Sequence, residues 1–306
     1  MRSINPFSAS PVAGSEVSTI DLGLANASGL QDFLLMEQDL RTAIKTRALA
    51  LHYQPLFTIQ DQKILGFEAL LRWRHAERGY ISPTEFIPLA EETGMIFGLG
   101  EWVLEQACAD ALAWGGGRKI AVNLSSIQFR DPNLPATIGA IIKRSGLPAD
   151  RLELEVNAGV LIEDTDAVMG MLVEIRALGV RISMDDFGTG FSSLSSLKRF
   201  PFDKIKIGRA FVSQLLADNE DGVTVKAILA LGHSMGMVAS AEGVESAEQF
   251  DYLHLEGCDE AQGFLLGRPM PFEYALALCN VPDVTGSEQQ ISTLDGHFPL
   301  LGGAQH

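Results

Sequence analysis

The sequence predicts an α/β fold, a (β/α)8 barrel in which eight strands alternate with helices. Three observations support this prediction. The 306 residues are 46% hydrophobic, which is enough to bury one large core. Short apolar runs alternate with longer runs of helical spacing, and the strand runs are nearly continuously apolar, as in sheets covered on both faces. A doubly wound open sheet is the alternative, but no G-x-G-x-x-G or Walker loop favours it.

The first 28 residues are rich in Ser, Ala and Gly and lack periodicity, so we expect a disordered tail or the remnant of a linker. Residues 31–47 then carry apolar side chains at helical spacing, with acidic residues early and basic residues late. This charge order matches the helix dipole and predicts a helix. Residues 29–280 form the predicted barrel domain, and residues 281–306, polar and Gly-rich, are expected to be a second disordered tail.

The predicted strands cover residues 51–57, 64–73, 120–124, 151–156, 180–184, 204–207, 237–240 and 262–266. The predicted helices between them cover residues 83–93, 98–114, 134–145, 165–178, 194–199, 222–236 and 247–255. Only the short turn Gln60-Asp61-Gln62 separates the first two strands. This turn leaves no room for a crossover helix and allows an antiparallel first pair.

Composition limits the partners and the compartment. The net charge of −16 would repel a nucleic-acid backbone or an anionic membrane surface, so we expect neither as a partner. Cys108, Cys258 and Cys279 are few and widely spaced, which fits a reducing compartment. The sequence shows no signal peptide and no apolar run of the ~18 residues that a membrane span needs. We therefore expect a soluble cytoplasmic protein.

Polar side chains occupy the ends of the predicted strands. In a barrel these ends converge on one face, where active sites lie. A single Glu on an apolar strand is usually paired for structural reasons, and Asp185 and Asp186 by themselves could close a strand and cap a turn. A whole set at one end is not explained in that way. The set consists of Glu68, Asn123, Glu155, Asp185, Asp186, Lys206, Glu242, Glu245 and Gln262.

The chemistry of this set favours hard metal ions. Asp185 and Asp186 repel each other at the mouth of an apolar strand, and a divalent cation would relieve that repulsion. No histidine lies at a strand end, and oxygen ligands favour Mg²⁺, Mn²⁺ or Ca²⁺ over zinc. Two ions bridged by Asp185 would suit phosphoryl displacement, with Lys206 holding water or stabilising charge. A one-metal site that uses Lys206 as a proton-abstracting base fits the same residues.

Seven motifs in order make the chain similar to a known family. Together they resemble the EAL-domain cyclic di-GMP phosphodiesterases of bacteria over about residues 35–273. The motifs are Tyr53-Gln54-Pro55, Glu68-Ala69-Leu70 with Leu71-Arg72-Trp73, Val122-Asn123-Leu124-Ser125, Asp185-Asp186-Phe187-Gly188-Thr189-Gly190, Lys204-Ile205-Lys206-Ile207, Ala241-Glu242-Gly243-Val244-Glu245 and Gln262-Gly263. The resemblance implies a modified TIM (β/α)8 barrel with an antiparallel first strand, and cleavage of cyclic di-GMP to linear pGpG.

The resemblance also implies roles for individual residues. Glu68, Asn123, Glu155 and Asp185 match a first metal site, and Asp186 and Glu242 match a second. Lys206, Glu242 and Asp186 match catalytic positions, with Lys206 near the nucleophilic water and Glu242 as a possible base. Gln54, Arg72, Glu245 and Gln262 match substrate-binding positions. Mg²⁺ or Mn²⁺ is the implied cofactor, with two ions, and Ca²⁺ is the implied inhibitor.

Two positions depart from the family pattern. Ala158 replaces a glutamate that steadies the Asp185-Asp186 loop, and Gly208 replaces an aspartate next to the metals. We therefore expect binding to survive better than turnover, because small errors in support cost rate. A catalytically silent cyclic di-GMP receptor is the alternative, and a partner-binding scaffold without ligand is a third. A homodimer and a protein partner on a regulatory surface are further expectations.

Overall fold

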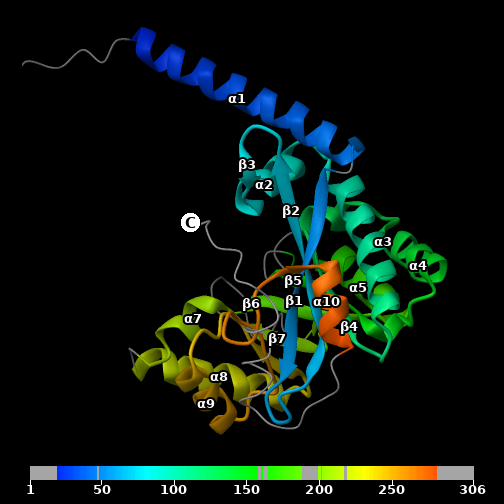
Figure 1. Ribbon diagram of the computed structural model, residues 1–306, viewed down its shortest axis with the longest axis vertical. Helices are drawn as coiled ribbons and strands as arrows, with labels where there is room; N and C mark the ends of the chain where they lie inside the picture. Colours follow the sequence, from blue (N-terminus) through cyan, green and yellow to red (C-terminus); the bar gives the residue numbers. More distant parts are fainter. Residues whose placement is uncertain are drawn as a thin grey trace, which may run out of the picture.

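A computed structural model describes residues 19–46, 48–157, 160, 165–187, 199–200, 202–216 and 219–280. Eight of the ten strands in these residues close into a ring, with helices outside it (Figure 1). The ring consists of β1 (Leu49–Thr58), β2 (Ile64–His75), β4 (Lys119–Leu124), β5 (Leu152–Asn157), β6 (Arg181–Phe187), β7 (Lys204–Ile207), β8 (Val238–Ala241) and β9 (Glu260–Ala261). The predicted barrel is confirmed.

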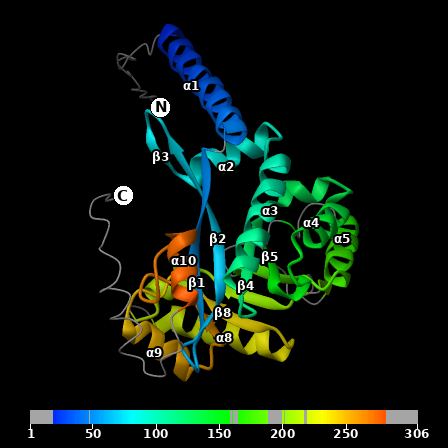
Figure 2. The same ribbon diagram turned by 45° about the vertical axis from the view of Figure 1, so that its right-hand side comes forward.

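The first strand runs against the others, as predicted. β1 is antiparallel to both of its neighbours in the ring, β2 and β9, whereas the pairs from β2 to β9 are parallel. The short turn after β1 makes this possible, and Gln62 adopts a left-handed φ of 52° there. The β1–β2 ladder extends from Leu49 opposite Trp73 to Phe57 opposite Ile64. It therefore forms a long ribbon that projects beyond the barrel (Figures 1 and 2).

A small second core lies at the projecting end of this ribbon. There β3 (Gly79–Ile81) pairs with β2, and α1 (Thr19–Thr46) and α2 (Pro83–Glu92) pack beside them. Trp73 and Phe86 are buried in contact, with their rings perpendicular and 5.5 Å apart. α1 begins at Thr19, well before the predicted start at residue 31. The early start was missed because glycines and polar residues obscure the helical pattern in the sequence. The predicted division of the chain at residues 28 and 281 stays a prediction.

The remaining helices surround the ring. They are α3 (Ile96–Trp114), α4 (Leu134–Ser145), α5 (Thr165–Ala177), α7 (Arg209–Gln214), α8 (Asn219–Ser234), α9 (Ala247–Leu255) and α10 (Phe272–Cys279), with 3-10 turns η1 (Ser126–Arg130) and η2 (Ala149–Arg151). Most of the predicted helix 194–199 lies outside the described residues. None of the described helices combines the length and hydropathy needed to cross a lipid bilayer.

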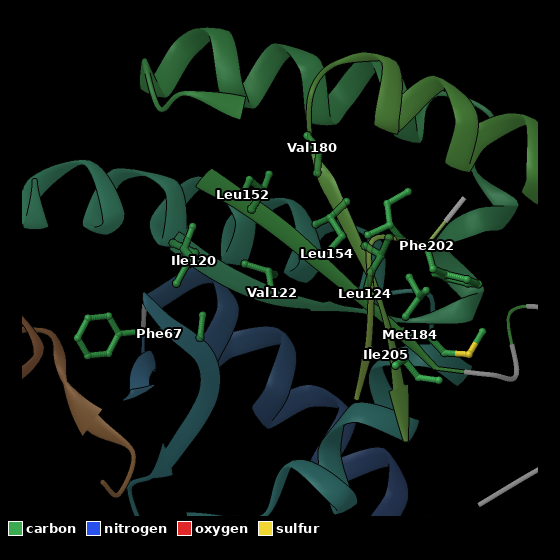
Figure 3. Packing of buried hydrophobic residues seen from close by; sticks show 14 of the residues in the cluster. Phe67, Ile120, Val122, Leu124, Leu152, Leu154, Val180, Met184, Phe202 and Ile205 are labelled. Carbon is green, nitrogen blue, oxygen red and sulfur yellow. The ribbon is translucent and has the colours of Figure 1, made fainter. Parts of the chain in front are cut away.

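The apolar core lies between the strands and these helices. Figure 3 shows part of it, with side chains from β4, β5, β6 and β7 packed beside neighbouring helices. On β5, Leu152, Leu154 and Val156 belong to this core, whereas Glu153 and Glu155 alternate with them. Because successive side chains of a strand point to opposite faces, the glutamates project into the barrel. The interior of the barrel is therefore partly charged.

The predicted last strand, residues 262–266, is wrong. The strand ends at Ala261, and Gln262 follows it instead of opening it. The chain turns at Gly263, where a Cβ atom would lie 2.1 Å from the carbonyl oxygen of Val244. The amides of Leu266 and Gly267 donate to the carbonyl oxygen of Gly263. The apolar run after Gly263 is thus a turn, and β10 (Met270–Pro271) then pairs with β1.

Candidate active site

Lys206 is the centre of a charged cluster inside the carboxyl end of the barrel. Its side chain is only 2% exposed. The Nζ atom lies 2.7 Å from Oε1 of Glu155 and 3.4 Å from Oδ1 of Asp185, and it also forms an ion pair with Glu242. These four residues come from β5, β6, β7 and the end of β8, so the barrel closure alone brings them together.

Glu68 is held beside this cluster by amide side chains. Asn123 Nδ2 donates to its Oε1 at 2.7 Å, and Gln262 Nε2 donates to its Oε2 at 2.7 Å. Gln262 Nε2 also donates to Oε1 of Gln54 at 3.1 Å, and Gln54 Nε2 donates to the carbonyl oxygen of Gly267 at 3.0 Å. Both carboxylate oxygens of Glu68 are thereby fixed in direction.

Asp185 and Asp186 both take part in the cluster although they are adjacent in sequence. Regular strand geometry would point them to opposite faces. The β6–β7 register shifts between Met184 and Phe187, and Asp186 adopts a left-handed φ of 50°. Such irregular, strained backbone is common at functional sites. As a result, one oxygen each from Asp185, Asp186 and Glu242 lies within 4.8 Å of the other two.

Burial and crowding of like charges shift the pKa values in this site. Burial, together with the charges of Glu68, Asp185 and Glu242, holds the pKa of Glu155 well above its usual range in spite of Lys206. Burial and the neighbouring Asp185 and Glu68 raise the pKa of Glu242 to about 8. Burial and Asp185 raise the pKa of Asp186 as well.

The same carboxylates keep Lys206 charged. Burial by itself lowers the pKa of a lysine, but Glu155, Glu242, Glu68 and Asp185 outweigh it, and the pKa of Lys206 is raised well above its usual value. Within the described residues, Lys206 thus faces four carboxylates, more than its single charge can balance. A further cation would stabilise this arrangement.

This donor set fits hard divalent cations. All the candidate ligand atoms are carboxylate or amide oxygens, which Mg²⁺ and Mn²⁺ prefer. Oε2 of Glu155 is buried and has no hydrogen-bond donor among the residues that the structure describes. An anionic oxygen left in this way is costly unless a cation meets it. The residues therefore fit the predicted metal site, and the assignment of each ligand to one of two ions stays a prediction.

Comparison with known proteins agrees with this geometry. Residues 37–269 match the model of the EAL domain. The chain belongs to the EAL-domain family. The bifunctional diguanylate cyclase/cyclic di-GMP phosphodiesterase MucR of Pseudomonas aeruginosa is 45% identical over 251 residues, which are 81% of this chain and 37% of that protein. The cyclic di-GMP phosphodiesterase NbdA of the same organism is 39% identical over 242 residues, 78% of this chain and 31% of that protein.

Solved structures of EAL domains are similar to this one. The PaMucR phosphodiesterase in its c-di-GMP complex superposes with a TM-score of 0.76 at 44% identity, covering 79% of this chain and 99% of that chain. The EAL enzyme Bd1971 in its cAMP-bound form gives a TM-score of 0.79 at 28% identity over 85% of this chain and 74% of that one. The chain spans only 29–37% of the length of the curated relatives MucR, NbdA and a Caulobacter vibrioides signalling protein.

The two remaining predicted substrate-binding residues, Arg72 and Glu245, differ in their surroundings. Arg72 lies near Glu68, is partly buried, and donates from Nη1 to the carbonyl oxygen of Leu71 at 2.9 Å. Burial lowers the pKa of Arg72, and Glu68 opposes that shift. Glu245 is exposed and forms a 2.7 Å ion pair with Arg209. The side-chain ion pair of Glu245 is thus with Arg209 and not with the carboxylate cluster around Lys206.

Arg209 is a residue that the sequence analysis missed. It pairs with Glu245, and its guanidinium lies 6.0 Å from the ring centroid of Phe264. Arg268 lies over the same ring at 4.2 Å. A signal was available, since Arg209 is the third residue after Lys206 on the strand-to-helix turn.

Of the two departures from the family pattern, the structure describes only Gly208. It directly follows β7 and is the N-cap of α7, with extended backbone (φ −61°, ψ 149°) and no side chain to cap the helix. Ala158 and the loop 188–198 lie outside the described residues, so the predicted effect of Ala158 stays a prediction.

Proposed function

We propose that this EAL domain is a metal-dependent phosphodiesterase that hydrolyses cyclic di-GMP to linear pGpG. The observation that carries the proposal is the cluster of Asp185, Asp186 and Glu242 around the buried cation of Lys206. The names of the similar proteins support the ligand and the reaction, since they include cyclic di-GMP phosphodiesterases and a c-di-GMP complex.

The cofactor in this proposal is Mg²⁺ or Mn²⁺, with two ions. Glu68, Asn123, Glu155 and Asp185 would hold one ion, and Asp186 and Glu242, with Asp185 shared, would hold the other. When bound, such ions activate water and neutralise the charge that develops on the phosphodiester. The amides of Asn123 and Gln262 fix the direction of the Glu68 oxygens, and this fixes where a ligand ion can sit.

The chain's own groups have distinct tasks in the reaction. Arg72 and Gln54 would orient the ligand, and a guanidinium suits a bidentate phosphate contact. Glu242 would accept a proton from the attacking water while the water oxygen bonds to phosphorus. The bond from phosphorus to the ribose oxygen would break, and that oxygen would take up a proton from solvent. Lys206, kept charged by its carboxylate neighbours, would stabilise the negative charge of the phosphoryl group in the transition state. Glu245 and Gln262 complete the predicted substrate-binding set.

Ala158 and Gly208, the two positions that differ from the family pattern in the sequence analysis, are compatible with a slow enzyme and also with a silent receptor. The receptor, which would bind cyclic di-GMP without cleaving it, is the second candidate function. In either case the proposal includes a cytoplasmic homodimer and a protein partner on a regulatory surface, and light scattering tests the dimer. For the enzyme it also includes inhibition by Ca²⁺.

A hydrolysis assay separates the candidates. The protein is incubated with cyclic di-GMP and Mg²⁺ or Mn²⁺, with an Asp185→Ala variant as the control. The phosphodiesterase predicts pGpG well above the control level, and equal amounts in both samples would refute it. Titration calorimetry with cyclic di-GMP in Ca²⁺ then tests the receptor, which requires micromolar or tighter binding without product.

A further inference from the structure

A second buried ion cluster lies inside the barrel beneath the candidate active site. Lys204 Nζ lies 2.7 Å from Oε1 of Glu153 and 2.6 Å from Oε2 of Glu260. The three side chains are 4%, 3% and 6% exposed. None of them belongs to the site described above. We call Lys204, Glu153 and Glu260 the lower triad.

Each member of the lower triad precedes a site residue by two positions in the sequence. Glu153 precedes Glu155 on β5, Lys204 precedes Lys206 on β7, and Glu260 on β9 precedes Gln262, which directly follows that strand. Residues two apart on a strand project from the same face. The lower triad and these site residues therefore form two successive layers of the barrel interior.

The layering follows the alternate strands of the ring. β2, β5, β7 and β9 are every second strand around the barrel, and side chains from alternate strands share a layer in such barrels. The upper layer contains Glu68, Glu155, Lys206 and Gln262, which make the site. The lower layer contains the triad, with Gly66 at the equivalent position of β2.

Lys204 joins strands that share no hydrogen-bond ladder with its own. β7 pairs with β6 and β8, whereas Glu153 and Glu260 lie on β5 and β9, one strand further on each side. Ser183 and Ser240, both buried, stand at the facing register positions: Ser183 opposite Lys204, and Ser240 opposite Glu260. Their small side chains leave space for Lys204 to reach past β6 and β8 to both carboxylates.

Stability alone is a weak reason to bury these three charges. The desolvation of buried ion pairs often cancels their attraction, and apolar replacements of similar volume are frequently neutral or stabilising. What an ion triad does supply is a fixed relation among the three strands, because a slip of any strand would separate the charges. The triad holds β5, β7 and β9 at the level immediately below Glu155, Lys206 and Gln262.

We infer that Lys204, through its ion pairs with Glu153 and Glu260, is a positioning residue that sets the relative heights of Glu155, Lys206 and Gln262 in the active site. Its ion pairs are with Glu153 and Glu260, outside the residues proposed to hold metal and substrate, and it acts through the strands that it joins. The predicted effect on kcat rests on the proposed function. The predicted effect on Mn²⁺ affinity can be measured without turnover.

The main test replaces the triad with an apolar one, Glu153→Leu, Lys204→Met and Glu260→Met together. This triple variant removes all three charges and leaves no carboxylate of the triad without its cation, so we expect it to fold with a melting temperature close to that of the wild type. Positioning predicts a fall of about tenfold or more in kcat and in Mn²⁺ affinity, the range typical of residues that orient metal ligands. Mn²⁺ affinity is measured by electron paramagnetic resonance.

A matched control removes an exposed ion pair. Lys226 and Glu256 are 2.8 Å apart, and Lys226 is half exposed. Lys226→Met with Glu256→Gln should leave kcat and Mn²⁺ affinity unchanged. An apolar-triad variant that folds and retains wild-type kcat and Mn²⁺ affinity would overturn the inference. If the wild type binds Mn²⁺ without cleaving cyclic di-GMP, the proposed function fails, and the ratio of Mn²⁺ affinities alone decides the role of Lys204.

Single variants decide the case in which the apolar triad does not fold. Glu153→Gln and Glu260→Gln each keep an acceptor for Lys204 and weaken one charge-assisted contact, so both should fold. Positioning predicts kcat and Mn²⁺ affinity lower by about threefold in each, because one ion pair of Lys204 becomes a weaker hydrogen bond to a neutral amide oxygen. Wild-type values in both single variants would overturn the inference.

Discussion

Gln54 stands directly opposite Glu68 in the β1–β2 ladder, and one nitrogen, Nε2 of Gln262, donates to both side chains. The antiparallel first strand is what makes this arrangement possible. It places a neutral amide beside the acidic cluster at the point where the ring closes between β1 and β9. The direction of Glu68 thus depends on an amide that is nearly two hundred residues away in the sequence.

Replacement of Gln262 should therefore lower activity without loss of the fold. Gln262→Met keeps the length of the side chain but donates to neither Gln54 nor Glu68. We expect a decrease of about tenfold to a hundredfold in kcat/KM, as for other residues that orient metal ligands. Steady-state hydrolysis of cyclic di-GMP measures the change, and circular dichroism verifies the fold. Unchanged kcat/KM would show that the direction of Glu68 does not depend on Gln262.

Removal of the Lys206 charge should destabilise the metal-free domain strongly. Lys206→Met leaves the buried Glu155 and the partly buried Asp185 and Glu242 without their cation, and breaking a buried ion pair such as Lys206–Glu155 costs roughly 3–5 kcal/mol. Excess Mn²⁺ should recover part of the stability by replacing the missing positive charge, while kcat stays low. Urea unfolding with EDTA and with Mn²⁺ measures both effects. Equal stability of variant and wild type in EDTA would contradict the prediction.

The stability of the metal-free domain should fall as the pH rises. Glu242 has its folded-state pKa raised to about 8 from the usual 4.5, and the pKa values of Glu155 and Asp186 are also raised. Between those pH values the folded state binds more protons than the unfolded state, so the free energy of unfolding decreases with rising pH. The contribution is fully present below about pH 4.5 and lost above about pH 8.

Glu242→Gln provides the control for this pH effect. The variant cannot titrate at position 242, so its stability should depend less on pH across the same window. Urea unfolding in EDTA at several pH values between 5 and 8 compares the two proteins. Identical slopes for variant and wild type would show that Glu242 does not carry the raised pKa.

The barrel and most of its strands could be predicted from the sequence because the apolar runs are short and regularly spaced. The error at residues 262–266 arose where an apolar run after Gly263 forms a turn, and only the close approach of the Val244 backbone reveals this. The alternation Leu152-Glu153-Leu154-Glu155 was visible as a period of two. Because this strand was expected to be apolar on both faces, the sequence analysis did not anticipate that Glu153 would add charge to the barrel interior.

The proximity of Glu155, Asp185, Lys206 and Glu242 was predictable because strand ends converge in a barrel, but their contacts were not. Nothing local in the sequence pairs Gln262 with Glu68, or Glu245 with Arg209, since these pairs depend on the closure of the ring and on side-chain directions. The register shift after Met184, which lets the side chains of Asp185 and Asp186 both join the cluster, is likewise a property of the β6–β7 pairing. Such contacts follow from the assembled barrel and not from the spacing of motifs.

Restoring the two residues that depart from the family pattern should raise turnover. Gly208 already has the extended backbone that an aspartate adopts at an N-cap, so Gly208→Asp should cap α7 without strain and return a carboxylate next to Lys206 and Ile207. If the resemblance holds at position 158, Ala158→Glu returns an acceptor that steadies the Asp185-Asp186 loop. We expect the double variant to have a higher kcat than the wild type at saturating Mg²⁺ or Mn²⁺, with similar affinity for cyclic di-GMP in Ca²⁺. Each single variant serves as a control, and a double variant no faster than the wild type would show that neither position limits turnover.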